Sequence, residues 1–206
     1  MSAAATREVV VATGNPHKLD EIRAILAGFH LDLVSMREFG VPEPVEDGDT
    51  FEANALIKAR ACARATGLPA IADDSGLEVD ALGGAPGVYS ARYAGEGAGD
   101  AANNAKLVDA LAGVPAEDRT ARFVCAAAVV TPDGHEVVVR GTMEGHIVDR
   151  PRGDHGFGYD PHFVSDAAGD GRTNAQLAPP EKDAISHRGE AFRALRPHVE
   201  ALLDPT

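Results

Sequence analysis

The stretch "EVVVATGNPHKLDEIRAILAGFHLDLV" (8–34) decides the class of fold. Its apolar opening, residues 8–12, predicts a buried strand. A helix is predicted next, because Asn15 suits an N-cap, Pro16 suits the first helical position, and leucine and isoleucine then recur at helical spacing. Residues 31–34 predict a second strand. Strand, helix and strand in this order form a β-α-β unit, which is typical of α/β proteins.

The rest of the chain adds strands to this unit in two ways. "LPAIA" (68–72) predicts a third strand that ends at two adjacent aspartates, Asp73 and Asp74. The apolar segments on either side of "PDG" (132–134) predict a β-hairpin. Because a hairpin is combined with β-α-β units, we expect an α/β protein with a mixed sheet. The chain length fits a single domain over residues 1–206.

Start and stop signals predict three further features of the helices. Asp49 opens a D-x-x-E signal for a helix that runs to about Thr66. Asp100 suits the cap of the next helix. The C-terminal segment has a helical pattern, in which Pro197 predicts a kink or a break.

The composition restricts the partners of the protein. The formal net charge is -13, which disfavours binding to nucleic acid or to an anionic membrane. Hydrophobic residues make up 44% and charged residues 25% of the chain, as in soluble globular proteins. No apolar run is long enough to span a bilayer and the N-terminus carries no secretory signal, so we expect a cytoplasmic protein.

The segment "TGNPHK" (13–18) is a candidate phosphate site. A glycine-containing loop between a strand and a helix start aims backbone N–H groups at an anion. Lys18 lies in the first turn of the helix, where a cation opposes the helix dipole unless an anion is bound. The spacing is not that of a Walker A motif. A plainly capped helix with an exposed lysine explains the motif equally well.

The segment "DDSG" (73–76) is a candidate metal site. Ligands of open α/β sheets bind at the carboxyl ends of strands, where these carboxylates are expected. Two carboxylates can hold Mg²⁺, or one can act as a general base toward water. An aspartate-rich turn is the structural alternative. A preceding loop supplies further acids, most of which we expect to be solvated: Glu43, Glu46, Asp47 and Asp49.

The segment "GDHGFGYDP" (153–161) is a candidate base site. Its glycines allow a close approach of the backbone, and Phe157 and Tyr159 offer flat faces to a base. It lacks the spacing of a dinucleotide fingerprint, and a glycine-rich loop with two core aromatics is the alternative.

The segment "EKDAISHRGEAF" (181–192) places three basic side chains around a predicted helix start: Lys182, His187 and Arg188. In so acidic a chain they indicate an anion pocket, although ordinary polarity at a helix start, with Ser186 as the cap, is the alternative. Phosphate cradles, carboxylates for a metal and groups for a base together describe a nucleoside triphosphate site.

Five motifs in fixed order closely resemble the inosine/xanthosine triphosphate pyrophosphatase family: "TGNPHK", "FEANALIKA", "IADDSGLEVDALGGAPGVYSARY", "GFGYDP" and "EKDAISHR". The resemblance covers about residues 8–203. It implies a two-lobed α/β domain with an elongated mixed sheet flanked by helices and an active-site cleft between the lobes. It also implies a Mg²⁺-dependent homodimer that hydrolyses ITP, dITP and XTP to the monophosphate and pyrophosphate, and so keeps such bases out of DNA and RNA.

The resemblance also implies roles for individual residues. It makes Asp74 the catalytic carboxylate and a metal ligand, and Glu43 a second metal-binding acid. Asp73 would add negative charge beside Asp74, and the sequence leaves open which of the two contacts the metal. Substrate binding is implied for the following residues: Thr13, Gly14, Asn15, Pro16, His17, Lys18, Asn54, Lys58, Ser75, Phe157, Gly158, Tyr159, Asp160, Lys182, His187 and Arg188.

Two other functions compete with hydrolysis to pyrophosphate. A nucleotide-binding sensor without turnover would explain the basic positions but not the clustered acids. A Mg²⁺-dependent phosphomonoesterase would need an aspartate nucleophile in a D-x-D arrangement, whereas this pair is adjacent.

Overall fold

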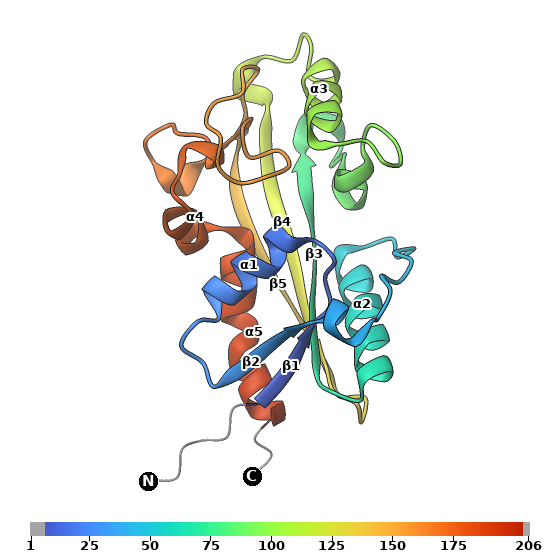
Figure 1. Ribbon diagram of the computed structural model, residues 1–206. Coiled ribbons are helices and arrows are strands. Elements are labelled where there is room, and N and C mark those ends of the chain that lie inside the picture. The colour runs from blue at the N-terminus through green and yellow to red at the C-terminus, as the bar shows by residue number, and fades with distance from the viewer. Residues whose placement is uncertain (1–6, 204–206) are drawn as a thin grey trace. The chain divides into compact units, whose positions relative to one another are not determined.

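The structure is a computed structural model that describes residues 7–203 (Figure 1). Its strands form one sheet in the order β2-β1-β3-β4-β5-β6. The strand bounds are β1 (Arg7–Val11), β2 (Leu31–Ser35), β3 (Ala70–Val79), β4 (Thr120–Val130), β5 (Glu136–Ile147) and β6 (Phe163–Ser165). β1 pairs in parallel with β2 and β3, whereas β5 and β6 are antiparallel. The predicted α/β class with a mixed sheet is therefore confirmed.

The longer helices are α1 (Pro16–Ile25), α2 (Phe51–Thr66), α3 (Asp100–Ala110), α4 (Pro179–Ile185) and α5 (His187–Leu203). None in the described part of the chain is long and apolar enough to cross a bilayer. The chain divides into two compact units by its internal contacts. Within the described residues, unit 1 holds 7–74, 126–141 and 188–203, and unit 2 holds 75–125 and 142–187.

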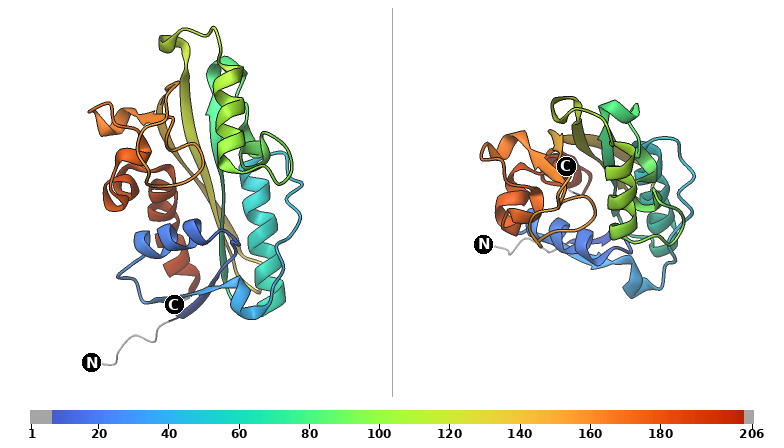
Figure 2. Two further views of the ribbon diagram at one scale, coloured as in Figure 1. Left: turned by 45° about the horizontal axis from the view of Figure 1, so that its top comes forward. Right: turned by 90° about the horizontal axis from the view of Figure 1, so that it is seen from above.

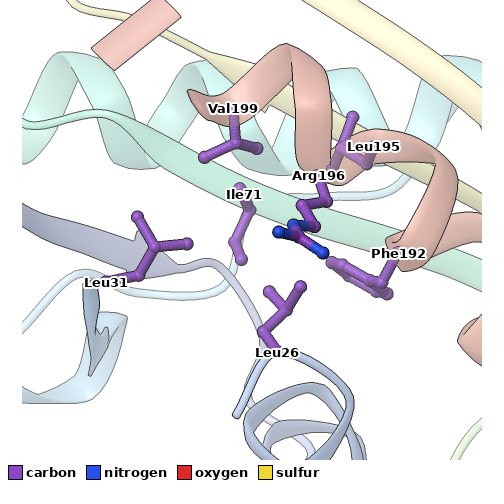
Figure 3. Close-up of a pocket in the computed structure, with 7 residues that line it drawn as sticks. All are labelled: Leu26, Leu31, Ile71, Phe192, Leu195, Arg196 and Val199. Carbon is purple, nitrogen blue, oxygen red and sulfur yellow. The ribbon is translucent and has the colours of Figure 1, made fainter. Parts of the chain in front are cut away.

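Unit 1 is built on the β-α-β arrangement of β1, α1 and β2. In this unit α2 lies on one face of the sheet and α1 and α5 lie on the other (Figures 1 and 2). The three valines of β1, Val9, Val10 and Val11, are fully buried between these layers. Seven side chains between α1, the sheet and α5 line a small apolar pocket (Figure 3): Leu26, Leu31, Ile71, Phe192, Leu195, Arg196 and Val199. The packing of α5 against the sheet is thus mainly hydrophobic.

Unit 2 has its own apolar core. The buried members come from β3, α3, β4 and β5, from β6 and from the segment before it: Leu77, Val79, Leu107, Leu111, Ala121, Phe123, Met143, Ile147, Tyr159 and Phe163. The rings of Phe123 and Phe163 meet at 4.7 Å between centroids in a tilted arrangement. This core fixes the ends of the elements that carry the "GFGYDP" segment.

β3 does not end at the two aspartates, as the sequence had predicted, but continues to Val79. Leu77 and Val79 are fully buried in the core of unit 2 and alternate with Glu78, which is less buried. That alternation is the period of a half-buried strand. The prediction was wrong because two adjacent aspartates were interpreted as the end of the strand. The strand continues because Leu77 and Val79 pack in the core of unit 2.

Three predictions about helices are also corrected. The N-cap of α2 is Thr50, whose hydroxyl accepts from Ala53 N–H, and not Asp49. Asp100 lies inside α3 after Gly99, which is the N-cap. α5 is not broken at Pro197, because Phe192, Leu195 and Val199 are buried against the sheet and hold the helix together; the kink stays a prediction.

Candidate active site

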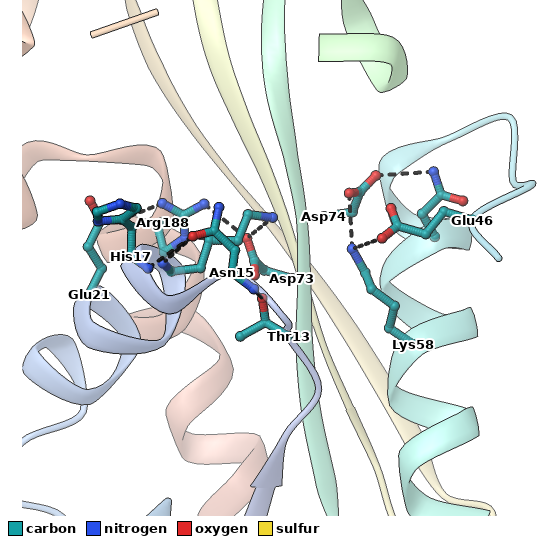
Figure 4. A network of polar contacts seen from close by, with 11 residues as sticks. Thr13, Asn15, His17, Glu21, Glu46, Lys58, Asp73, Asp74 and Arg188 are labelled. Carbon is teal, nitrogen blue, oxygen red and sulfur yellow. Dashed lines mark hydrogen bonds and ion pairs between the residues drawn. The ribbon is translucent and has the colours of Figure 1, made fainter. Parts of the chain in front are cut away.

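The two adjacent aspartates lie on opposite faces of β3 (Figure 4). Successive side chains of a strand point to opposite faces of the sheet. Asp74 accordingly meets side chains of α2, whereas Asp73 meets side chains of α1 and α5. The pair is therefore the meeting point of two separate polar clusters.

The Asp74 cluster is organised by α2. Asn54 Nδ2 donates to Asp74 Oδ2 at 3.1 Å, and Lys58 Nζ donates to Oδ1 at 3.1 Å. Asn54 and Lys58 are four positions apart and so share one face of α2. Both oxygens of Asp74 are thus oriented by one helix, while the side chain remains 9% exposed.

Glu46 joins this cluster from the loop before α2. Lys58 Nζ lies 3.1 Å from Glu46 Oε1, so the ammonium bridges two carboxylates. The loop is tied down because Asn54 Oδ1 accepts from Gly48 N–H at 2.8 Å while its amide group holds Asp74. Asn54 therefore positions the acid loop and the aspartate at the same time.

The charges of this cluster shift its pKa values in a consistent way. Burial raises the pKa of Glu46 above its usual range; Lys58 partly lowers it, and Asp74 raises it further. Burial lowers the pKa of Lys58, but the carboxylates of Asp74, Asp73 and Glu46 outweigh it, so the net pKa is raised. Lys58 is therefore a cation at neutral pH.

The chemistry of the donors fits a magnesium ion at Asp74 and Glu46. Both supply carboxylate oxygens, which Mg²⁺ prefers, and both already share one cation, Lys58. Mg²⁺ needs only one or two carboxylates because it keeps several waters. Among residues 7–203, no group of three or more His, Cys, Asp or Glu side chains is placed to hold a metal ion. The metal-binding roles implied for Asp73, Asp74 and Glu43 stay predictions.

The Asp73 cluster is a buried ion network. Asp73 Oδ2 lies 3.1 Å from Lys18 Nζ and 3.0 Å from Arg188 Nη2. Arg188 also pairs with Glu21 of α1. The side chain of Asp73 is 0% exposed and that of Arg188 is 2% exposed. Two cations and two anions thus join α1, β3 and α5 without a large excess of charge.

The phosphate-loop candidate is capped by its own residues. Asn15 Oδ1 accepts from the N–H groups of His17 at 2.9 Å and Lys18 at 3.4 Å, and Pro16 has no N–H. The predicted N-cap and first helical position are confirmed. An anion at this loop is therefore met by the Lys18 ammonium, and by these N–H groups only after Asn15 moves.

Two charged side chains lie beside Gly14 in this loop. A Cβ on Gly14 would overlap the Glu43 carboxylate, so Glu43 packs against the loop and does not share Lys58 with Asp74 as Glu46 does. The Arg37 guanidinium donates to the Gly14 carbonyl. A side chain at position 14 would therefore make the Glu43 carboxylate move.

In unit 2 the "GFGYDP" segment is organised around Asp160. Its Oδ2 accepts from Lys182 Nζ at 2.7 Å and from Phe157 N–H at 3.1 Å, and its Oδ1 accepts from Asn174 Nδ2 at 3.2 Å. The Lys182 ammonium also lies 5.1 Å from the centre of the Phe157 ring. Asp160 therefore orients the cation and shapes the turn that presents the aromatic ring.

Other predicted residues of unit 2 have structural partners as well. The Tyr159 hydroxyl donates to the Ser90 carbonyl at 2.8 Å, and burial raises the Tyr159 pKa, so this phenol stays neutral. The His187 ring stacks on Phe123 at 4.9 Å. Ser75 is half-buried on β3. Tyr159 and His187 are thus held in the core of this unit.

Comparison with known proteins identifies the family. The Ham1 family matches residues 9–198. A dITP/XTP pyrophosphatase of Geobacter sulfurreducens is 54% identical over 193 residues, which cover 93% of this chain and 96% of the relative. This chain belongs to the Ham1 family.

Solved structures of Ham1 proteins have the same fold. A HAM1 protein from Coxiella burnetii superposes with a TM-score of 0.85 at 44% identity, covering 94% of this chain and 98% of that one. A nucleoside-triphosphatase / dITP/XTP pyrophosphatase from Mycobacterium abscessus gives a TM-score of 0.72 at 52% identity, covering 92% and 99%. The family resemblance inferred from the sequence motifs is confirmed.

The structure adds three residues of this Ham1 chain to the candidate site. Glu46 had been named as one of four candidate acids of the loop, most of which were expected to be solvated, but it had been given no role. Glu21 and Arg37 carried no signal, because their partners are distant in sequence. The substrate-binding and metal-binding roles of the predicted residues stay predictions.

Proposed function

We propose that this chain hydrolyses the non-standard purine nucleoside triphosphates ITP, dITP and XTP to the monophosphate and pyrophosphate. The observation that carries the proposal is the Asp74 cluster, in which a partly exposed carboxylate is oriented by Asn54 and Lys58 and shares a cation with Glu46. Membership of the Ham1 family and the printed names of its relatives support the same reaction.

The residues of the Asp74 cluster, together with Lys18 of the Asp73 cluster, have distinct tasks in this reaction. Asp74 takes a proton from the water that attacks the α-phosphorus, as a positioned general base. Lys58 and Lys18 stabilise negative charge on the transferring phosphoryl group and on the departing pyrophosphate. We assign the metal ligands to Asp74 and Glu46. Mg²⁺, when bound, supplies a Lewis acid for the phosphate oxygens and lowers the pKa of water.

Base recognition belongs to residues of unit 2. Hypoxanthine and xanthine carry a 6-keto acceptor where adenine carries an amino donor. The Lys182 ammonium is a donor with more than one N–H group, so it favours the keto bases, and Phe157 offers a face for stacking. A mismatched buried polar group costs roughly 1–3 kcal/mol, about one to two decades in selectivity.

The family resemblance also supports a homodimer. The protein is then expected to be a dimer in light scattering, with a mass that does not change on dilution, and a stable monomer would overturn this part of the proposal.

The proposed substrates belong to the nucleotide pool, so we also propose that the reaction takes place in the cytoplasm. Its role is then to remove bases that would otherwise enter DNA and RNA.

A panel of nucleoside triphosphates with Mg²⁺, scored for pyrophosphate and for orthophosphate, tests the function. We expect pyrophosphate from ITP, dITP and XTP, with kcat/KM well above that for ATP and GTP. Binding without any product would indicate a sensor, and orthophosphate would indicate a phosphomonoesterase. Comparable kcat/KM for ITP and ATP would overturn the pool-cleansing role.

A further inference from the structure

Two side chains of α3 hold the backbone of Gly158, inside the "GFGYDP" segment. Gly158 N–H donates to Asp100 Oδ2 at 2.7 Å, and Asn104 Nδ2 donates to the Gly158 carbonyl at 2.9 Å. Asp100 and Asn104 are four positions apart and therefore lie on one face of the helix. Both polar groups of this one residue are thus bonded to the same rigid element.

The chemistry of these contacts determines which groups work there. A carbonyl oxygen accepts only, so the Asn104 amide must present its NH₂ group and not its oxygen. Gly158 N–H needs an acceptor, which the Asp100 carboxylate supplies with a charge-assisted bond. The side chain at position 100 must accept a hydrogen bond, whereas the side chain at position 104 must donate one. An aspartate at position 104 therefore cannot replace the asparagine.

The conformation of Gly158 affects the positions of the residues on either side of it. Its φ is 62°, a left-handed conformation that glycine adopts easily and that other residues rarely adopt. On its two sides are Phe157, whose N–H donates to Asp160 Oδ2, and Tyr159. The same Asp160 oxygen holds Lys182. A shift of Gly158 therefore displaces the aromatic face and the cation together.

We propose that Asp100 and Asn104 are positioning residues for base selectivity: by clamping Gly158 to α3 they hold Phe157 and Lys182 in the arrangement that distinguishes a 6-keto from a 6-amino purine. The inference rests on the proposed function and adds two residues of unit 2 to the proposed recognition of the base. A protein donor that faces the amino group of adenine loses its full hydrogen-bond free energy only if the loop cannot move away. Selectivity therefore depends on the two contacts that fix Gly158 to α3.

Asn104→Asp is the sharpest test of the clamp. The substitution is isosteric, but it places a carboxylate oxygen against the Gly158 carbonyl where a donor stood. We expect the ratio of kcat/KM for ITP to kcat/KM for ATP to fall about 5- to 10-fold, the equivalent of one lost hydrogen bond. Competitive inhibition by pyrophosphate, which has no base, should keep its Ki.

Matched variants separate positioning from charge and from folding. Ala105→Asp adds the same charge at an exposed neighbouring position of α3 and should keep the wild-type ratio. Asp100→Asn, which retains an oxygen acceptor, should lose less selectivity than Asp100→Ala. If Asn104→Asp does not melt cooperatively, Asn104→Ala gives the same readout without the added charge.

Three results would overturn the inference. The first is a wild-type ITP/ATP ratio in both Asn104→Asp and Asp100→Ala. The second is an equal loss of selectivity in Ala105→Asp, which would indicate a charge effect. The third is a parallel rise of the pyrophosphate Ki, which would indicate general damage. An unmodified protein that releases no pyrophosphate from ITP would overturn the proposed function and the inference with it.

Discussion

The two faces of β3 use the same residue type in opposite ways. On the α1 and α5 side, the Asp73 carboxylate is sealed from solvent and is surrounded by Lys18 and Arg188, with Glu21 balancing the charge. On the α2 side, Asp74 keeps some exposure and shares Lys58 with Glu46. The difference teaches that burial and partners, and not residue type, separate a structural aspartate from one available for chemistry.

Replacing Asp74 with Asn should have the largest effect of the changes that test this comparison. The substitution removes the proposed base and a proposed metal ligand, so we expect kcat to fall on the order of 10²–10⁴-fold. The melting curve should stay close to that of the wild type, because Lys58 keeps Glu46 as a partner. Asp47→Asn, at an exposed position of the acid loop, is the matched control. Near-normal turnover of the folded variant would exclude Asp74 as the key carboxylate.

Asp73→Ala should chiefly lower stability. It leaves Arg188 buried without its Asp73 partner, and breaking a buried pair in this way costs about 3–5 kcal/mol. Urea unfolding measures the loss, with Asp47→Ala as the control. If Asp73→Ala were as stable as the wild type but required more Mg²⁺, Asp73 would be a metal ligand and the contrast between the faces would fail.

Glu46→Gln and Glu43→Gln are a matched pair for the metal site. We expect the Mg²⁺ concentration for half-maximal activity to rise at least about 10-fold in Glu46→Gln. This is the smallest loss of metal affinity expected when a residue that only orients a metal ligand is mutated, and loss of a ligand itself should cost at least as much. Glu43→Gln should change it little, because Glu43 packs on Gly14. The reverse order of effects would return the metal to Glu43.

Lys18→Ala should have a smaller effect than the changes at Asp74, Asp73 and Glu46. Part of the Lys18 charge is already balanced by Asp73, so we expect KM for ITP and the Ki of pyrophosphate to rise together by about 5- to 10-fold. Inosine, which lacks phosphates, should inhibit the variant and the wild type equally. Unchanged constants for ITP would make Lys18 a structural partner of Asp73 only.

Locally encoded features of the fold and the site were predicted well. The start of α1 was predicted correctly because Asn15 and Pro16 act on N–H groups within the next turn. Asn54 and Lys58, which the resemblance named together, meet Asp74 from one face of α2 because they are four positions apart. The prediction that Asp49 caps α2 was wrong. Both Asp49 and the next residue, Thr50, are suitable N-cap residues, and the geometry of the loop selects Thr50.

The sequence by itself determined the α/β class, the opening β-α-β unit, the β-hairpin and the family, because hydrophobic period, caps and long motifs are local properties of the chain, whereas the short strand β6 was not predicted. Only the tertiary structure decided that β3 runs past the aspartates, that these point to opposite faces, and that Glu46 and not Glu43 shares Lys58 with Asp74. It also showed Arg188 paired with Asp73, 115 positions away in the sequence. Such pairings depend on which distant elements pack together, and packing minimises buried unpaired charge over the whole molecule.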